Sequence, residues 1–258
     1  MRLVQGIAIG AMAVITNSAL GVELRVLSAG AIEPGLKAAV ADFQQATQHS
    51  VVVTFNTAPQ LRKRLETSCV PASPALGCGG ETWDVVVAPP AVLEDFVKSG
   101  KLKADASPVG KVGLGVAVRE GARVPEIANV QALQGALVAV RALVFNRAST
   151  GLYFESWLRK AGLYDQLEAR TVRFDDGASV MERLIKGSGD EIGVGAITEI
   201  LLYRDKGLRY VGPLPPGVQN FTSYSAASTT GSAPPAQLLV HYLGSPRGQE
   251  FFKAAGIE

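Results

Sequence analysis

Cysteine, histidine and basic clusters are scarce in this chain of 258 residues. It contains two cysteines and two histidines, its formal net charge is +2 at pH 7, and its lysines and arginines form no stripe. Surfaces that bind nucleic acid carry a concentrated basic patch, so we expect no nucleic-acid partner. Two thiolates do not complete a tetrahedral metal shell, and neither His49 nor His241 is close to a cysteine in sequence. We therefore predict no metal site.

Recognisable catalytic and cofactor motifs are also missing. The chain has no nucleophile elbow, no zinc-protease helix motif and no phosphate-cradling P-loop. The closely spaced glycines of residues 110–115 are not a dinucleotide fingerprint, because no helix start follows them. We predict no cofactor and no catalytic residue. These absences favour a binding protein over an enzyme, although an isomerase that needs a single base would leave no motif either.

The N-terminus has no apolar run long enough to cross a bilayer. Residues 7–15 are apolar, Arg2 precedes them, and Ala19-Leu20-Gly21 has the small-x-small pattern of a cleavage site. This pattern predicts an export signal over residues 1–21, the alternative being an uncleaved anchor. No cysteine lies near the cleavage site, which excludes a lipoprotein anchor. We expect a periplasmic protein.

The two cysteines, Cys69 and Cys78, lie nine positions apart in a segment rich in proline and glycine. An exported protein meets an oxidising compartment, so we predict a disulfide between them. In the chain-entropy model, a disulfide that closes a loop this short raises the free energy of unfolding by roughly 2–3 kcal/mol. We assign this segment a structural role.

The most informative stretch begins after a short alternating apolar pattern at residues 22–26, which predicts a strand. Small residues including Ser28 and Ala29 follow, and then apolar residues at helical spacing from Leu36 to Ala46. The free N–H groups of a helix start and the helix dipole make such a loop an anion site. Ser28 adds a hydroxyl, and Ala29 lets a ligand approach the backbone. The alternative is a plain strand-to-helix connection.

Two similar strand–loop–helix patterns follow the one at Ser28. Thr57 and Ala58 stand between a β-branched strand at 50–55 and a helix pattern at 60–66. The hydroxyl of Thr57 either binds an anion or caps the helix.

The third loop joins an apolar strand predicted over 136–145 to a helix that carries Leu152. Its candidate ligand-binding residues are Arg147, Ser149, Thr150 and Gly151. The hydroxyls donate hydrogen bonds, glycine allows close approach, and arginine pairs with a carboxylate or oxyanion. The alternative is that a hydroxyl only caps the helix while the arginine is solvated.

A fourth loop precedes a helix that contains Ser179 and Val180. Asp175 and Asp176 in this loop are predicted to be turn and cap residues and not an acid–base pair.

Recurring strand–loop–helix units predict an α/β fold with two lobes, each a mostly parallel sheet flanked by helices, with a ligand cleft between them. Extended segments near 110–118 and 219–227 are predicted to cross between the lobes. We expect lobe 1 to comprise residues 22–110 and 220–258, and lobe 2 residues 111–219. The four loops would face one cleft.

Five stretches carry a resemblance to a known family: Val26–Ala31, Phe55–Leu65, Trp83–Leu102, Ser149–Tyr164 and Leu239–Phe251. The last contains Ser-Pro-Arg-Gly-Gln between an apolar and an aromatic helix. With these stretches the chain resembles the type II periplasmic solute-binding proteins, and within them the molybdate-binding branch of ABC importers. The resemblance implies a small anionic ligand and an ABC transporter membrane subunit as partner. We expect a monomer.

In that family, hydroxyls and backbone N–H groups at helix starts hold a tetrahedral oxyanion. Ser28 matches the first-lobe serine, and further donors are implied around Ser149–Gly151 and Ser179–Val180. Ala58 stands where the family has a second serine, and Ala196 where it has a tyrosine. Each missing bond to a charged group costs roughly 1–3 kcal/mol. A di- or tricarboxylate is therefore as good a predicted ligand as molybdate or tungstate.

A second resemblance is to the periplasmic aconitate isomerases, enzymes built on the same fold. Their reaction moves a proton next to a carboxylate and needs a general base. Neither histidine is placed for this role, and the candidates are a hydroxyl or a carboxylate such as Glu199. An isomerase of an unsaturated tricarboxylate is thus the alternative to a binding protein.

Overall fold

The computed structural model describes residues 21–69 and 80–258. The predicted export signal, apart from Gly21, and Cys78 lie outside the described residues, so the signal and the disulfide stay predictions. In the described ranges, no helix is long and apolar enough to cross a membrane.

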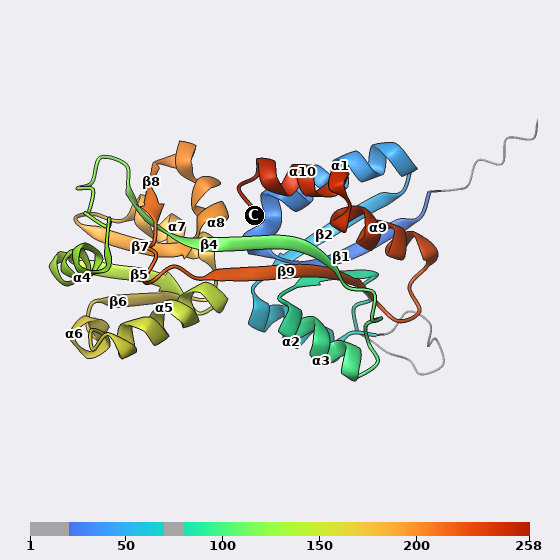
Figure 1. Ribbon diagram of the computed structural model, residues 1–258, viewed down its shortest axis with the longest axis horizontal. Helices are drawn as coiled ribbons and strands as arrows, with labels where there is room; N and C mark the ends of the chain where they lie inside the picture. Colours follow the sequence, from blue (N-terminus) through green and yellow to red (C-terminus); the bar gives the residue numbers. More distant parts are fainter. Residues whose placement is uncertain (1–20, 70–79) are drawn as a thin grey trace, which may run out of the picture.

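Two lobes lie side by side and are joined by two long strands (Figure 1). Lobe 1 contains β1 (Glu23–Ala29), β2 (Ser50–Asn56), β3 (Val85–Ala88), the 3-10 turn η1 (Gly30–Ile32), α1 (Glu33–Thr47), α2 (Ala58–Thr67), α3 (Pro90–Lys98), α9 (Pro234–Gly244) and α10 (Pro246–Ala254). β1 pairs in parallel with both β2 and β3. The core of this lobe includes Leu24, Phe43 and Trp83, all almost completely buried.

Lobe 2 has its own parallel strands and its own buried cores. It contains α4 (Val130–Ala139), β5 (Ala142–Asn146), α5 (Ser149–Lys160), α6 (Tyr164–Glu168), β6 (Thr171–Phe174), α7 (Gly177–Lys186), β7 (Glu191–Ala196), α8 (Ile197–Leu201), the 3-10 turn η2 (Arg204–Lys206) and β8 (Leu208–Pro213). β5 pairs in parallel with β6 and β7. One apolar cluster surrounds Phe145 and Phe154, and a smaller one surrounds Met181.

The crossing strands are β4 (Ser107–Arg119) and β9 (Phe221–Ser228). β9 pairs with β3 and with the first half of β4, whereas the second half of β4 pairs with β7 and β8. All of these pairings are antiparallel, and the strand order along the sheet is β2-β1-β3-β9-β4-β7-β5-β6. The sheet therefore runs through both lobes, and the two strands form the connection that the sequence predicted.

The predicted strand over 136–145 is wrong in its first part. Residues 136–139 continue helix α4, and the strand β5 begins only at Ala142. Asn129 caps α4 by accepting a hydrogen bond from the N–H of Ala132, and Leu133 and Leu137 are fully buried one turn apart. The apolar run was too short to distinguish a buried helix from a strand by periodicity.

Close packing of helices fixes the outer face of lobe 1. A Cβ atom added at Gly35 of α1 would lie 2.6 Å from the Cδ1 atom of Phe252 in α10. Glycine at this position lets the C-terminal helix lie directly on α1, which holds the loop between β1 and α1 in place.

Candidate functional site

A cavity of about 570 Å³ lies between the lobes. It is lined by Ala29, Gly30, Ala31, Glu33, Lys37, Phe55, Asn56, Thr57, Ala58, Gln60 and Tyr224 from lobe 1 and its crossing strand, and by Asn146, Ala148, Ser149, Thr150, Asp176, Gly177, Ala178, Ala196, Glu199, Leu202, Tyr203 and Lys206 from lobe 2.

Besides α1, which begins with the acidic residue Glu33, three helices of ten or more residues begin at this cavity. Ala58 opens α2, Ser149 opens α5 and Gly177 opens α7, and all three residues line the cavity. The first N–H groups of a helix lack partners within the helix, and the helix dipole adds partial positive charge there. The strand–loop–helix arrangement thus directs backbone donors from both lobes into one space, which suits an anion.

Asn146, at the end of β5, organises the start of α5. Its Oδ1 atom accepts hydrogen bonds from the N–H groups of Ala148 and Gly151, each at 3.1 Å, and from the hydroxyl of Thr150 at 3.3 Å. Its amide nitrogen makes no hydrogen bond within the described residues, and Asn146 lines the cavity. Sequence reasoning missed this residue, although a polar side chain closing an apolar strand was a usable signal.

Gly151 is needed for this arrangement, and the group that approaches it closely belongs to the chain itself. A Cβ atom at this position would overlap the carbonyl oxygen of Asn146. Gly151 is buried and does not line the cavity.

The structure brings half of the predicted ligand-binding residues to the cavity. Ala29, Thr57, Ala58, Ser149 and Thr150 line it. Thr57 is also the N-cap residue of α2, and its N–H donates to Oε1 of Gln60 at 3.0 Å.

The remaining predicted residues do not line the cavity. Ser28 is fully buried, and its hydroxyl donates to the carbonyl oxygen of Ala29 at 3.2 Å. The N–H of Ser179 donates to the capping carboxylate of Asp176, and Val180 is packed in the core of lobe 2. A ligand contact by any of these residues stays a prediction.

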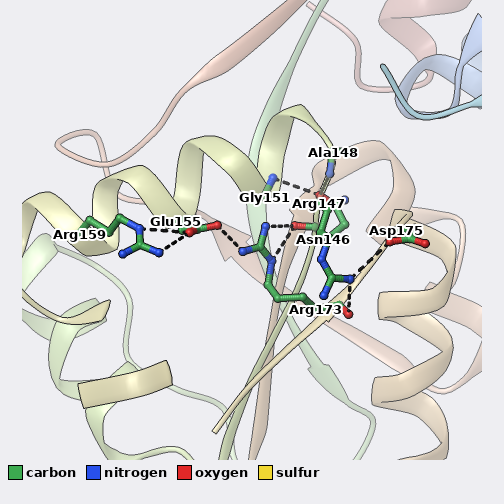
Figure 2. Close-up of polar contacts among 8 residues, drawn as sticks. All are labelled: Asn146, Arg147, Ala148, Gly151, Glu155, Arg159, Arg173 and Asp175. Atoms are coloured by element: carbon green, nitrogen blue, oxygen red, sulfur yellow. Dashed lines mark hydrogen bonds and ion pairs between the residues drawn. The ribbon is translucent and has the colours of Figure 1, made fainter. Parts of the chain in front are cut away.

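Arg147 points toward β6 and the next loop (Figure 2). Its Nη1 atom donates to the carbonyl oxygen of Arg173 at 3.0 Å and lies 3.4 Å from Oδ1 of Asp175. Its side chain is more than half exposed, and it does not line the cavity. Behind it, Arg173 pairs with Glu155 and donates to the carbonyl oxygen of Asn146, which braces the end of β5 (Figure 2).

The charged residues of the cavity are Glu33, Lys37, Asp176, Glu199 and Lys206. Lys37 pairs with Glu33 within α1, whereas Lys206 has no carboxylate partner in the part of the chain that the structure describes. Burial, together with the nearby carboxylates of Asp176 and Glu33, raises the pKa of the Glu199 carboxyl to about 7. No three metal-binding side chains cluster in residues 21–69 and 80–258.

Two tyrosines supply hydroxyl groups at the same place. Burial raises the pKa of Tyr224, on β9, and of Tyr203, after α8. Both therefore stay protonated near neutral pH and can donate hydrogen bonds to a ligand. Ala196, at the end of β7, is fully buried at the base of the cavity and leaves space beside them.

Comparisons with known proteins agree with this geometry. Residues 24–258 match the family model of the bacterial extracellular solute-binding protein. Among curated proteins, the aconitate isomerase of a Pseudomonas species is 24% identical over 259 residues, covering 98% of this chain and 95% of that protein.

Two solved structures show the same fold. The periplasmic molybdate-binding protein of Azotobacter vinelandii has a TM-score of 0.69 at 18% identity and covers 91% of this chain and 98% of its own. The sulfate-binding protein SubI of Mycobacterium tuberculosis has a TM-score of 0.68 at 15% identity, with coverage of 92% and 86%. The predicted two-lobe periplasmic-binding-protein fold is confirmed.

Proposed function

The chain belongs to the bacterial extracellular solute-binding protein family, and from this premise we propose that it captures a small di- or tricarboxylate between its lobes. The observation that carries the proposal is the interlobe cavity, where three helix starts and the ammonium groups of Lys37 and Lys206 meet. Carboxylates are satisfied by backbone N–H groups and by charge-assisted hydrogen bonds of this kind.

The size of the cavity favours an organic anion over a tetrahedral oxyanion. Its volume of about 570 Å³ falls in the range of roughly 300–1,000 Å³ that is typical of sites for small organic molecules. A five-atom oxyanion would leave most of this space unfilled. Phe55 and Leu202 give the lining an apolar part that suits the carbon skeleton of an organic acid.

Anions are named for several of the similar proteins, whereas one solved structure, HitA of Pseudomonas aeruginosa, is iron-bound. Molybdate and sulfate are named for two solved structures, and aconitate, a tricarboxylate, is named for the curated relative. By analogy with these proteins, this chain works in the periplasm and delivers its ligand to the membrane subunit of an ABC importer. Lobe closure over the ligand would provide the signal that the importer reads.

The isomerisation of aconitate is a second candidate function. The observation that favours it is the carboxylate of Glu199, which lines the cavity and has no ion-pair partner in the described chain. A base near the bound carbon skeleton has no evident purpose in a protein that only carries an anion.

Calorimetric titration of the mature, ligand-stripped protein tests the proposal. The panel is citrate, cis-aconitate, trans-aconitate, molybdate, tungstate, sulfate and phosphate. We expect tight binding of a tricarboxylate, and the double variant Lys37→Ala, Lys206→Ala should weaken it by about tenfold or more. Lys98→Ala, which removes an exposed lysine on α3 outside the cavity, is the matched control. Tight molybdate binding without any carboxylate binding would overturn the proposed ligand class.

A further inference from the structure

We propose that Glu199 is a catalytic residue that moves a proton along the carbon skeleton of an unsaturated carboxylate bound in the cavity. The inference rests on the proposed function, because it requires a carboxylate ligand held between the lobes. It deepens the second candidate function by assigning Glu199 as the group that moves the proton and by stating which bonds change.

Glu199 lies where the two lobes meet. It is carried by α8 of lobe 2, and its two carboxylate oxygens abut glycines of opposite lobes. A Cβ atom at Gly177 would overlap Oε2, and a Cβ atom at Gly30 would lie 3.4 Å from Oε1. The absence of a side chain at Gly177 therefore creates the space that the carboxylate occupies, whereas a side chain at Gly30 would only touch it.

The carboxylate of Glu199 has no polar partner in the part of the chain that the structure describes. Within residues 21–69 and 80–258, the side chain of Glu199 makes no hydrogen bond and no ion pair. Two other carboxylates with little exposure do have such partners: Glu191 pairs with Arg141 and Arg183, and Glu155 pairs with Arg159 and Arg173. A carboxylate without partners that faces a ligand cavity is free to exchange a proton with the ligand.

The surroundings of Glu199 suit general base chemistry. The titratable groups that line the cavity with it are Asp176 before α7, Glu33 and Lys37 on α1, Tyr203 and Lys206 after α8, and Tyr224 on β9. Burial, followed by the charges of Asp176 and Glu33, raises the pKa of Glu199 to about 7. A general base works best when its pKa lies near the operating pH, since it must both accept and return the proton.

The reaction can be written without any further reactant. Glu199 accepts a proton from a CH2 group that lies between a carboxylate and a C=C bond. The electron pair of the broken C–H bond spreads over the allylic system, and the double bond moves by one position. The protonated Glu199 then returns the proton to the far carbon of that system. One C–H bond breaks and one forms, no oxidation state changes overall, and the product is an isomer of the substrate.

The rest of the cavity supplies the remaining requirements. The helix starts at Ser149 and Gly177 and the ammonium group of Lys206 can hold the substrate carboxylates and stabilise the negative charge that develops on them. The histidines are not alternatives. Nδ1 of His49 accepts a hydrogen bond from the N–H of Val22 at 3.2 Å, and His241 is exposed on α9, so neither lines the cavity.

The test follows cis-aconitate and trans-aconitate by proton NMR in D2O, with calorimetry on the same samples. We expect the wild-type protein to interconvert the isomers and to introduce deuterium at the allylic carbons. Glu199→Gln should slow turnover by about 10²–10⁴-fold, the usual contribution of a general base. The same variant should bind the ligand as tightly as the wild type or more tightly, because it loses a negative charge beside an anion.

Two further variants sharpen the comparison. Glu199→Asp keeps the carboxylate but withdraws it by one methylene group, so we expect intermediate turnover with an unchanged fold. Glu94→Gln makes the same charge change at an exposed position on α3 and should match the wild type. The pH profile of kcat/KM should rise with an apparent pKa near 7, set by Glu199.

Each other outcome overturns a distinct claim. Binding without turnover by the wild type would refute the reaction and leave the proposed carrier function standing. Full turnover by Glu199→Gln would refute the assignment of this residue. Absence of binding to every carboxylate would refute both the inference and the proposed function.

Discussion

The hydroxyl of Thr198 donates a hydrogen bond to the carbonyl oxygen of Ala31, which joins the start of α8 in lobe 2 to the turn η1 in lobe 1. Both residues are buried, and α8 also packs against α1. The bond lies beside the cavity and places Glu199, the residue after Thr198, against lobe 1. This one contact therefore couples the closure of the lobes to the position of the carboxylate.

Thr198→Val should weaken that closure. The variant keeps the shape of the side chain but leaves the buried carbonyl oxygen without its donor, at a cost of roughly 1–3 kcal/mol. We expect a larger radius of gyration by small-angle X-ray scattering and an affinity for the tricarboxylate that is several-fold lower. Thr198→Ser retains the hydroxyl and should behave like the wild type. Equal scattering and affinity for all three proteins would show that the bond does not hold the lobes together.

Gly177→Ala should disturb the site through Glu199. The added methyl group would overlap the carboxylate, so either Glu199 moves into the cavity or the start of α7 shifts. We expect the calorimetric affinity for the tricarboxylate to fall by at least about tenfold. Gly135→Ala is the control, since a Cβ atom there meets nothing within 4 Å and the residue lies inside α4. That change should raise the free energy of unfolding by about 0.5–1 kcal/mol without altering affinity.

Much of this architecture could be predicted from the sequence, because strand–loop–helix units have clear local patterns. The apolar alternation before Ser28 and the helical spacing after it locate β1 and α1, and the glycine-spaced strand at 109–118 becomes the crossing strand β4. The positions of Thr57 and Ser149 at the cavity follow from the rule that ligands bind at the carboxyl ends of parallel strands. These predictions need only the order of strands, loops and helices along the chain.

The roles of individual side chains could not be predicted in the same way, because they depend on contacts distant in sequence. Arg147 was a candidate ligand-binding residue of the third loop, but its side chain donates to the carbonyl oxygen of Arg173 on the neighbouring strand and does not line the cavity. Glu199 was one candidate base among several in the sequence, and its place at the cavity depends on its position against Gly30, 169 positions earlier in the chain. No local pattern encodes either relationship.

The stability of the protein should fall as pH rises from about 4.5 to 7. Glu199 has a folded-state pKa of about 7 against an ordinary value of 4.5, so the folded state binds more protons than the unfolded state in this window. The free energy of unfolding should therefore fall by on the order of 2 kcal/mol over this pH range. This figure allows for the partial exposure of Glu199 to solvent. In urea unfolding of Glu199→Gln, the free energy of unfolding should not show this decrease with pH. Asp42 and Glu155 have lowered pKa values, so their contributions to the stability of the folded state are lost only at more acidic pH.

Asn146 offers a test that separates the folding of the site from its binding. Asn146→Ala removes the acceptor of three hydrogen bonds and should lower the free energy of unfolding by roughly 1–3 kcal/mol. Asn146→Asp keeps an acceptor at the same place, so the start of α5 should stay folded. It replaces the free amide nitrogen by a negatively charged oxygen that faces the cavity, and an anionic ligand should then bind at least about tenfold more weakly. Urea unfolding and calorimetry of both variants measure the two effects separately. If Asn146→Asp bound the tricarboxylate as well as the wild type, the amide would lie outside the binding site, and the donors would have to come from the helix starts and lysines alone.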